Sequence, residues 1–270
     1  MAEPTLFCLR VRYRETGRLR YLSHLELLRA LERLMRRAQL PYAVTQGFSP
    51  RIKASYGPAL PVGVASNDEW FDVWLQELRP ASEYLERLRA AAPSDLMPLE
   101  AAYVDTHAPS LSASLVFSSW EATLGIWPDV CESWPYATPT LADIEAACQS
   151  IVHDGSLTYM RNGKPKTVDL EHKLERLPQV SASQEKDTWA TITFTTRASN
   201  EGALRPDVFL DAVAMRLTDS LTVQGAKQTE HVLPDSNLSV SSRKYFRIAI
   251  VRLAQYLEGE DGEWVRPMQH

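Results

Sequence analysis

The chain has 270 residues, of which 44% are hydrophobic, so it is long enough to bury the core of one large domain or two small ones. It has no apolar run of signal-peptide length and no stretch of about 18 uncharged apolar residues, so we expect a cytoplasmic protein without a membrane helix. The three cysteines lie far apart and the six histidines are scattered, so we expect no disulfide framework, metal site or iron–sulfur centre.

Charge is distributed unevenly along the chain. The net charge is −5, but residues 1–61 carry 11 Lys and Arg against 4 Asp and Glu, and the rest carry 18 against 30. A basic part in an otherwise acidic chain is typical of a protein with an anionic partner, although a solvated basic helix face would give the same composition.

The first half of the chain has the pattern of a compact α+β unit. Basic and apolar residues alternate in the first strand, and Ser23 and Glu26 form a capping box before an amphipathic helix that Pro41 ends. The expected elements are strand 5–14, helix 23–40, strand 42–46 with an extended return over 51–66, strand 69–76, helix 80–93 and strand 97–105.

The second half repeats this order of elements. The pattern predicts strand 112–125, helix 140–155, a hairpin over 157–170 around Asn162 and Gly163, strand 188–197, helix 205–217 and a last strand at 228–234. The expected fold is therefore α+β, with two tandem ferredoxin-like βαββαβ units and antiparallel sheets, over residues 1–108 and 109–235. Residues 236–270 are a C-terminal extension whose pattern is compatible with a strand or a helix.

One face of the first sheet is expected to lie open, because a ferredoxin-like sheet has helices on its other face only. This open face would carry Arg10, Arg12, Arg14, Trp70 and Trp74. Basic groups that hold phosphates and flat rings that stack on bases are the groups that bind single-stranded RNA. The alternative is that the second domain covers this face and that the tryptophans pack between the domains.

Residues 46–63, QGFSPRIKASYGPALPVG, form a basic segment rich in glycine and proline. Arg51 and Lys53 would point the same way if the segment is extended, and they would bind phosphate. The spacing matches neither a P-loop nor GxGxxG, so we expect no nucleotide cofactor. A β-hairpin arm stiffened by its prolines is the alternative.

His24 lies in the first turn of the arginine-rich helix. With Tyr21 and Lys53 nearby, it could act as the base in metal-free RNA cleavage. A structural role is favoured, because no second acid or base has a fixed spacing to it.

Three motifs resemble those of a known family. They are GRLRYLSHLE at 17–26, QGFSPR at 46–51 and ALPVGVAS at 59–66, and they match a bacterial radical SAM-linked domain of unknown function that is fused to, or encoded beside, radical SAM proteins. The resemblance continues weakly at KTVDL (166–170) and LRPDVFL (204–210). The chain departs from the family pattern where Glu171 and His172 replace an Arg-Pro pair.

The resemblance implies a stand-alone partner of a radical SAM protein, because the chain has no CxxxCxxC motif to hold a cluster of its own. A more distant similarity in architecture links the chain to the tandem ferredoxin-like RAMP proteins that process CRISPR RNA. That similarity supports RNA binding more than RNA cleavage.

Together, these features predict a non-catalytic RNA-binding or substrate-presenting accessory protein of a radical SAM enzyme, acting in tRNA or rRNA modification. The alternatives are a metal-independent endoribonuclease of RAMP type and a protein-interaction module that docks on the radical SAM partner. No oligomeric state is predicted. The residues expected to contact RNA or another anion are Arg18, Arg20, His24, Arg29, Arg33, Gln46, Phe48, Arg51, Lys53 and Tyr56.

Overall fold

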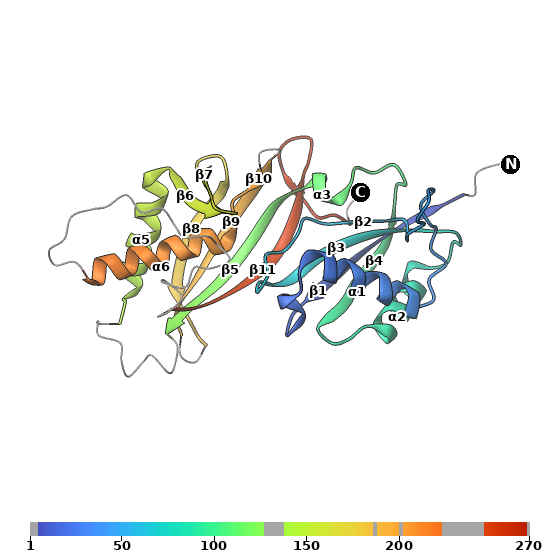
Figure 1. The fold of residues 1–270 in the computed structure, drawn as a ribbon, viewed down its shortest axis with the longest axis horizontal. Helices are drawn as coiled ribbons and strands as arrows, with labels where there is room; N and C mark the ends of the chain where they lie inside the picture. Colours follow the sequence, from blue (N-terminus) through green and yellow to red (C-terminus); the bar gives the residue numbers. More distant parts are fainter. Residues whose placement is uncertain (1–4, 127–137, 186–187, 200–201, 223–245, 269–270) are drawn as a thin grey trace. The chain divides into compact units, whose positions relative to one another are not determined.

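The computed structural model describes residues 5–126, 138–185, 188–199, 202–222 and 246–268. These residues form an α+β protein with a large, mostly antiparallel sheet and five α-helices (Figure 1). None of the described helices is long and apolar enough to cross a membrane. The chain divides into two compact units, one of Met1–Phe117 with Arg252–His270 and the other of Ser118–Val251.

The first unit contains most of the elements that the first half predicted and three short ones that it did not. They are β1 (Phe7–Glu15), the 3-10 helix η1 (Leu19–Tyr21), α1 (His24–Arg37), β2 (Ala54–Tyr56), β3 (Ala65–Leu75), α2 (Ala81–Ala91), β4 (Leu96–Val104), α3 (Leu111–Ser114) and β12 (Trp264–Val265), with parts of β5 (Leu115–Ile126) and β11 (Phe246–Glu258). β1 pairs antiparallel with both β3 and β4, and β2 pairs antiparallel with β3. The expected strand at 42–46 does not form as a regular strand. This stretch makes the isolated bridges Tyr42–Leu75 and Val44–Ile52, and the Ala43 N–H donates to the carbonyl oxygen of Trp74 at 2.7 Å.

The helices α1 and α2 cover one face of β1, β3 and β4 (Figure 1). The strand residues on this face are those that the alternation predicted, and they are almost fully buried: Leu9, Val11, Tyr13, Phe71, Val73 and Leu75. Leu27 and Leu31 of α1 and Leu88 of α2 complete the core. Full burial of one such leucine contributes about 1.5–3 kcal/mol, so this face fixes the position of α1 on the sheet.

The opposite face is covered around Arg10 and Trp70, which corrects the prediction of an open face there, while Arg14 is exposed. Arg10 and Trp70 are only 3% and 1% exposed. Leu257 belongs to the same buried cluster as Trp70, and Arg10 Nη1 donates to the carbonyl oxygen of Pro267 at 3.0 Å. The cover is therefore the C-terminal part of the same unit. The alternative prediction had the second domain as the cover. The observed contact joins residues about 250 positions apart within one unit, which no local pattern indicates.

The second unit contains α5 and α6 and a second set of strands. Its elements are α5 (Leu141–Asp154), β6 (Ser156–Arg161), β7 (Lys164–Asp169), β8 (Leu174–Ala182), β9 (Thr188–Ser199), β10 (Gly202–Ala203) and α6 (Pro206–Thr222), with the remainder of β5 and β11. The strand order is β10-β9-β5-β11, β8 pairs with β9, and β6 and β7 form a separate two-stranded sheet.

Two local predictions for the second unit concern turns and strand ends. The hairpin around Asn162 and Gly163 is confirmed, with φ values of 52° and 71° at these residues, as a two-residue β-turn requires. The predicted last strand at 228–234 lies outside the described residues. β5 lies between β9 and β11 in the sheet. β11 comes from the C-terminal extension, whose sequence pattern was compatible with a strand or a helix.

Candidate anion-binding surface

A capping box fixes the start of α1. The backbone N–H and the hydroxyl of Ser23 both donate to Glu26 Oε2, at 2.8 and 2.7 Å, so the predicted capping box is present. These hydrogen bonds hold the pKa of Glu26 below its usual value. The capping box fixes the first turn of α1, in which His24 lies, and η1, with Arg18 and Arg20, comes directly before it.

Two of the sequence motifs, 17–26 and 59–66, are in direct contact. The backbone N–H of Gly63 donates to the carbonyl oxygen of Arg20 at 2.7 Å, and Gly63 has a φ of +91°, which other residues rarely adopt. The Arg20 guanidinium lies 4.9 Å from the centre of the Tyr21 ring and donates to its hydroxyl at 2.8 Å. Beside them Tyr21, Leu25 and Val62 are exposed, so this end of α1 presents apolar and cationic groups together.

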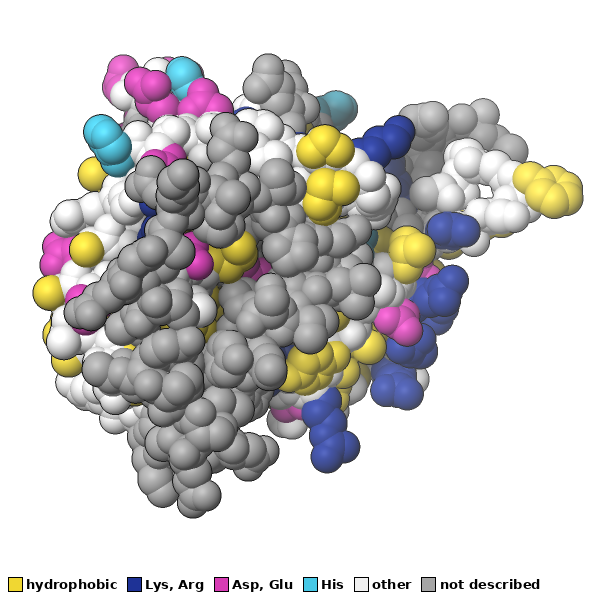
Figure 2. Space-filling model, turned by 60° about the vertical axis from the view of Figure 1, so that its left-hand side comes forward, with side chains coloured by type: hydrophobic (Ala, Val, Ile, Leu, Met, Phe, Trp, Pro, Cys, Tyr) yellow, Lys and Arg dark blue, Asp and Glu magenta, His cyan; other side chains and the backbone are white. Residues whose placement is uncertain are grey.

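The outer face of α1 is basic. Arg29, Arg33 and Arg37 recur at every fourth position and are exposed, opposite the buried Leu27 and Leu31. Within the described part of the chain, none of these three arginines forms an ion pair. Figure 2 shows Lys and Arg side chains gathered on one side of the space-filling view.

Most other arginines of the first unit have partners. Arg87 and Arg89 donate to backbone carbonyl oxygens. Others bind carboxylates, in the pairs Arg10–Asp72, Arg12–Asp68, Arg36–Glu32, Arg79–Glu83, Arg252–Glu69 and Arg266–Asp68. Arg14, Arg18 and Arg51 also make no side-chain ion pair or hydrogen bond with a described residue, but the outer face of α1 has three such guanidinium groups in a row.

His24 is half-buried, and its Nδ1 atom is enclosed without a hydrogen-bond partner among the described residues. Lys53, the other group considered for catalysis, lies with its ammonium 5.3 Å from the centre of the Trp74 ring. Its backbone pairs with Ala43, after the end of α1, whereas His24 begins this 14-residue helix of about 21 Å. The two residues therefore lie at opposite ends of α1.

Residues 45–51 form the tip of a hairpin arm. The Thr45 N–H donates to the Arg51 carbonyl oxygen at 2.8 Å, and the Arg51 N–H donates to Thr45 Oγ1 at 3.1 Å. Ile52 is buried and anchors the arm, while Phe48 at its tip is 106% exposed. A phenylalanine held in water by a closed loop has no packing role in this unit.

The predicted contact residues consequently fall into separate groups. Arg18, Arg20 and His24 lie at the start of α1, and Arg29 and Arg33 lie along its outer face. The residues from the glycine- and proline-rich segment are divided between the hairpin tip (Gln46, Phe48, Arg51) and the extended stretch behind it (Lys53, Tyr56).

Tyr56 is packed against the core under α1. Burial raises its pKa to about 12, and the negative charge of Glu32 is the next largest cause of this rise.

The predicted contact residues did not include Arg37, although its spacing from Arg33 places it on the same helix face. They also did not include Leu25 and Val62, whose exposure no sequence signal gives.

One group in the described residues has the composition of a metal site. Asp169, Glu171 and His172 are exposed, and each offers a ligand atom within 4.8 Å of the others. His172 Nδ1 lies 2.6 Å from Asp169 Oδ2, and this hydrogen bond lowers the pKa of Asp169. The sequence predicted no metal site, and the spacing of these residues within one turn gave no motif.

Comparison with known proteins adds a family but no activity. A family of uncharacterized proteins conserved in bacteria, DUF2344, matches residues 8–206. No curated protein matches the chain.

Solved structures that resemble the chain include an unknown protein from Galdieria sulphuraria, with 8% identity, coverage of 91% of this chain and 98% of that one, and a TM-score of 0.24. Another is a DypB variant from Rhodococcus jostii RHA1 in complex with heme, with 9% identity, 94% coverage of both chains and a TM-score of 0.21. At these TM-scores neither likeness supports a conclusion.

Proposed function

This chain belongs to the DUF2344 family of uncharacterized proteins conserved in bacteria, and we propose that it is a non-catalytic RNA-binding accessory protein of a radical SAM enzyme. In this proposal the RNA lies along the outer face of α1. RNA modification, of tRNA or rRNA, is the context that the sequence motifs imply.

The observation that carries the proposal is the distribution of paired and unpaired arginines. Arg29, Arg33 and Arg37 are exposed and, in the described part of the unit, make no ion pair, while most arginines elsewhere in it bind carboxylates or carbonyl oxygens. A row of unpaired guanidinium groups repels itself, and phosphate groups spaced along a nucleic acid relieve that repulsion while releasing counterions.

Apolar groups next to this row favour RNA with unpaired bases. Tyr21 and Phe48 are exposed aromatic side chains at the two ends of the surface, and each has a free ring face for stacking. The Arg20 guanidinium already stacks on one face of Tyr21, which holds that ring in place.

The fold that we propose for this function is a tandem pair of ferredoxin-like units. In the first unit the pairings give the order β4-β1-β3-β2, which supports this topology. In the second, β8-β9-β5-β11 supports the same order, with the β6–β7 hairpin inserted after the first helix. The link to a radical SAM protein rests on the sequence motifs alone.

The test is RNA binding by matched arginine variants. Full-length protein would be titrated with bulk tRNA and with a single-stranded RNA at several salt concentrations. Arg33→Gln should weaken binding to both and reduce the salt dependence by about one ion per lost phosphate contact. Arg79→Gln is the control, because this arginine is also exposed in the first unit but is paired with Glu77 and Glu83.

Three outcomes would reject the proposal. The first is equal weakening in the Arg33 and Arg79 variants, which would indicate nonspecific attraction. The second is binding that does not weaken with salt, which would favour a protein-interaction module. The third is cleavage of the RNA in EDTA that Arg33→Gln preserves and His24→Ala abolishes, which would favour the endoribonuclease.

A further inference from the structure

The second unit contains a cavity of about 810 Å³ that the proposed RNA-binding surface does not use. It is lined by the end of β7, the turn that follows it, the end of β9 and β10. A volume of this size is typical of small-molecule sites. Its lining includes residues 166–169 from the weaker part of the sequence motifs, so a motif without an assigned role lies at a cavity.

One wall of the cavity contains a buried ammonium group. Lys173 is 7% exposed, and its Nζ donates to the carbonyl oxygen of Gly202 at 2.8 Å and to the hydroxyl of Ser199. Both acceptors are neutral, and among the described residues no carboxylate pairs with Lys173. A buried cation without a counter-charge costs free energy, which a bound anion would offset.

A second ammonium group approaches the same wall. A Cβ atom added to Gly202, whose φ is +108°, would lie 3.6 Å from Lys166 Nζ. Lys166 and Lys173 therefore meet at one glycine that has no side chain to separate them from a ligand. Lys166 forms no ion pair with another described residue.

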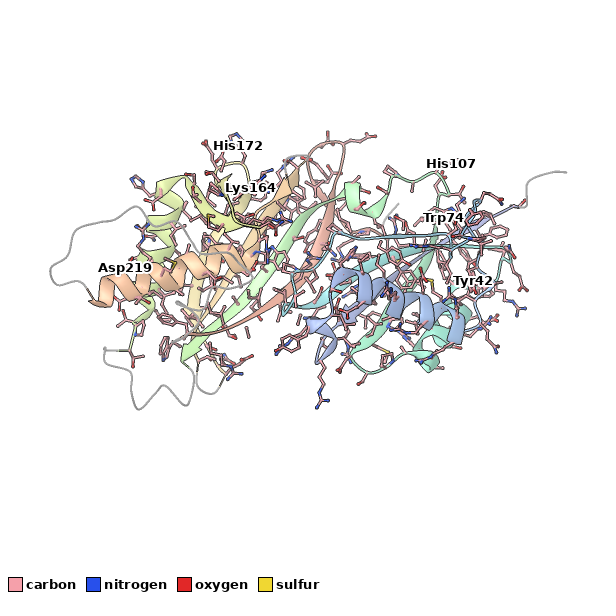
Figure 3. All side chains as sticks on the ribbon, in the orientation of Figure 1. Tyr42, Trp74, His107, Lys164, His172 and Asp219 are labelled. Carbon is pink, nitrogen blue, oxygen red and sulfur yellow. The ribbon has the colours of Figure 1, made fainter. Side chains whose placement is uncertain are left out.

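The lining also contains three carboxylates, and within the described residues none of them forms an ion pair with Lys166 or Lys173. Asp169 is hydrogen-bonded to His172 at 2.6 Å, and Glu175 lies 3.5 Å from Arg197. Glu171 is exposed on the turn after β7, where Figure 3 shows His172 at the surface. The two ammonium groups at Gly202 therefore lie outside the pairs that these carboxylates make.

We propose that this cavity binds a phosphate group, free or carried by a small phosphomonoester, between the ammonium groups of Lys166 and Lys173. Two ammonium groups match the double charge of a phosphate better than the single charge of a carboxylate. Lysine, with three N–H donors on a compact charge, reaches separate oxygens of such an anion.

Calorimetric titration of the full chain in phosphate-free buffer at 0.15 M salt tests this site, with inorganic phosphate in one arm and phenyl phosphate in the other. Lys166→Gln should weaken binding by about tenfold, the effect of removing one charge-assisted hydrogen bond. Lys164→Gln is the matched control, because it removes the same charge two residues earlier on β7 and does not line the cavity. Tighter binding of phenyl phosphate would identify a monoester site.

Lys173→Gln gives a second measurement, with circular dichroism to verify that the buried substitution leaves the fold intact. It should also weaken binding by at least tenfold. The proposal is overturned if neither probe binds the unmodified protein, or if Lys164→Gln weakens binding as much as Lys166→Gln. It is also overturned if an Arg29→Gln, Arg33→Gln variant loses the phosphate binding, because the anion would then lie on α1 in the first unit.

Discussion

Arg10 and Asp72 form a buried, two-pronged ion pair across the adjacent strands β1 and β3. Nε and Nη2 of Arg10 donate to the two carboxylate oxygens at 2.8 and 2.9 Å, and both side chains are almost completely buried. The arginine that the strand pattern offered for RNA phosphates is therefore neutralised inside the protein. Its charge contributes to the fold and is not available to a ligand.

Removing one partner of this pair should destabilise the protein strongly. Asp72→Ala leaves the guanidinium buried without its carboxylate, so we expect a loss of about 3–5 kcal/mol in the free energy of unfolding, measured by urea denaturation. Glu83→Ala breaks the exposed pair with Arg79 and should cost less than about 1 kcal/mol. Equal losses in the two variants would contradict the account of the Arg10–Asp72 pair.

Local signals in the sequence predicted the parts of the fold that depend on neighbouring residues. The capping box at Ser23, the apolar face of α1 and the turn at Asn162 and Gly163 all follow from short-range patterns. The burial of Arg10 on the other face of the first sheet does not follow from such patterns, because it depends on a contact with Pro267, about 250 residues away. Strand register is equally nonlocal, and without it the sequence gives no sign that Asp72 lies opposite Arg10.

The candidate surface was predicted to a similar extent. Helical spacing placed Arg29 and Arg33 on one exposed face, since that face is set by the buried leucines opposite. The contact between the motifs at 17–26 and 59–66 could not be predicted from the sequence, because the hydrogen bond between Gly63 and Arg20 depends on how β3 pairs with β1. For the same reason the sequence presents residues 46–63 as one basic segment, although the structure divides them between the two ends of α1.

Gly63 should be sensitive to substitution. Alanine at its φ of +91° is strained, so Gly63→Ala should cost about 1–3 kcal/mol and weaken RNA binding by displacing the segment that holds Arg20. Gly57→Ala is the control, since this nearby glycine has no unusual φ and the nearest atoms to an added Cβ lie at 3.4 Å. Thermal unfolding and RNA titration would measure both effects, and similar results for the two variants would exclude a special role for Gly63.

Phe48 should matter for binding and not for stability. Its side chain is fully exposed at the hairpin tip, so Phe48→Ala should change the free energy of unfolding by less than about 0.5 kcal/mol. If its ring stacks on a base, the same change should weaken binding of single-stranded RNA by about 1–3 kcal/mol. Leu78→Ala removes another exposed apolar side chain of the first unit and should leave binding unchanged. An unaffected RNA affinity in Phe48→Ala would remove the hairpin tip from the surface.

Glu15 should make stability depend on pH. Its carboxyl group is 2% exposed, Oε2 has no hydrogen-bond partner among the described residues, and burial, with Glu69 nearby, raises its pKa from 4.5 to about 8. Between these two values the folded state holds a proton that the unfolded state has lost. Stability should therefore fall as the pH rises from about 4.5 to about 8.

Glu15→Gln should remove this part of the pH dependence, because glutamine has the shape of the protonated acid and does not ionise. Glu69 contributes a slope of the same sign, since burial raises its pKa also, so some dependence on pH should persist in the variant. Urea denaturation should be measured at several pH values across this range. At the alkaline end, the free energy of unfolding of the variant should exceed that of the unmodified protein by roughly a few kcal/mol, relative to their difference at the acidic end. Parallel curves for the two proteins would mean that Glu15 is ionised in the folded state, with Arg252, whose charge lowers its pKa, as its counter-charge.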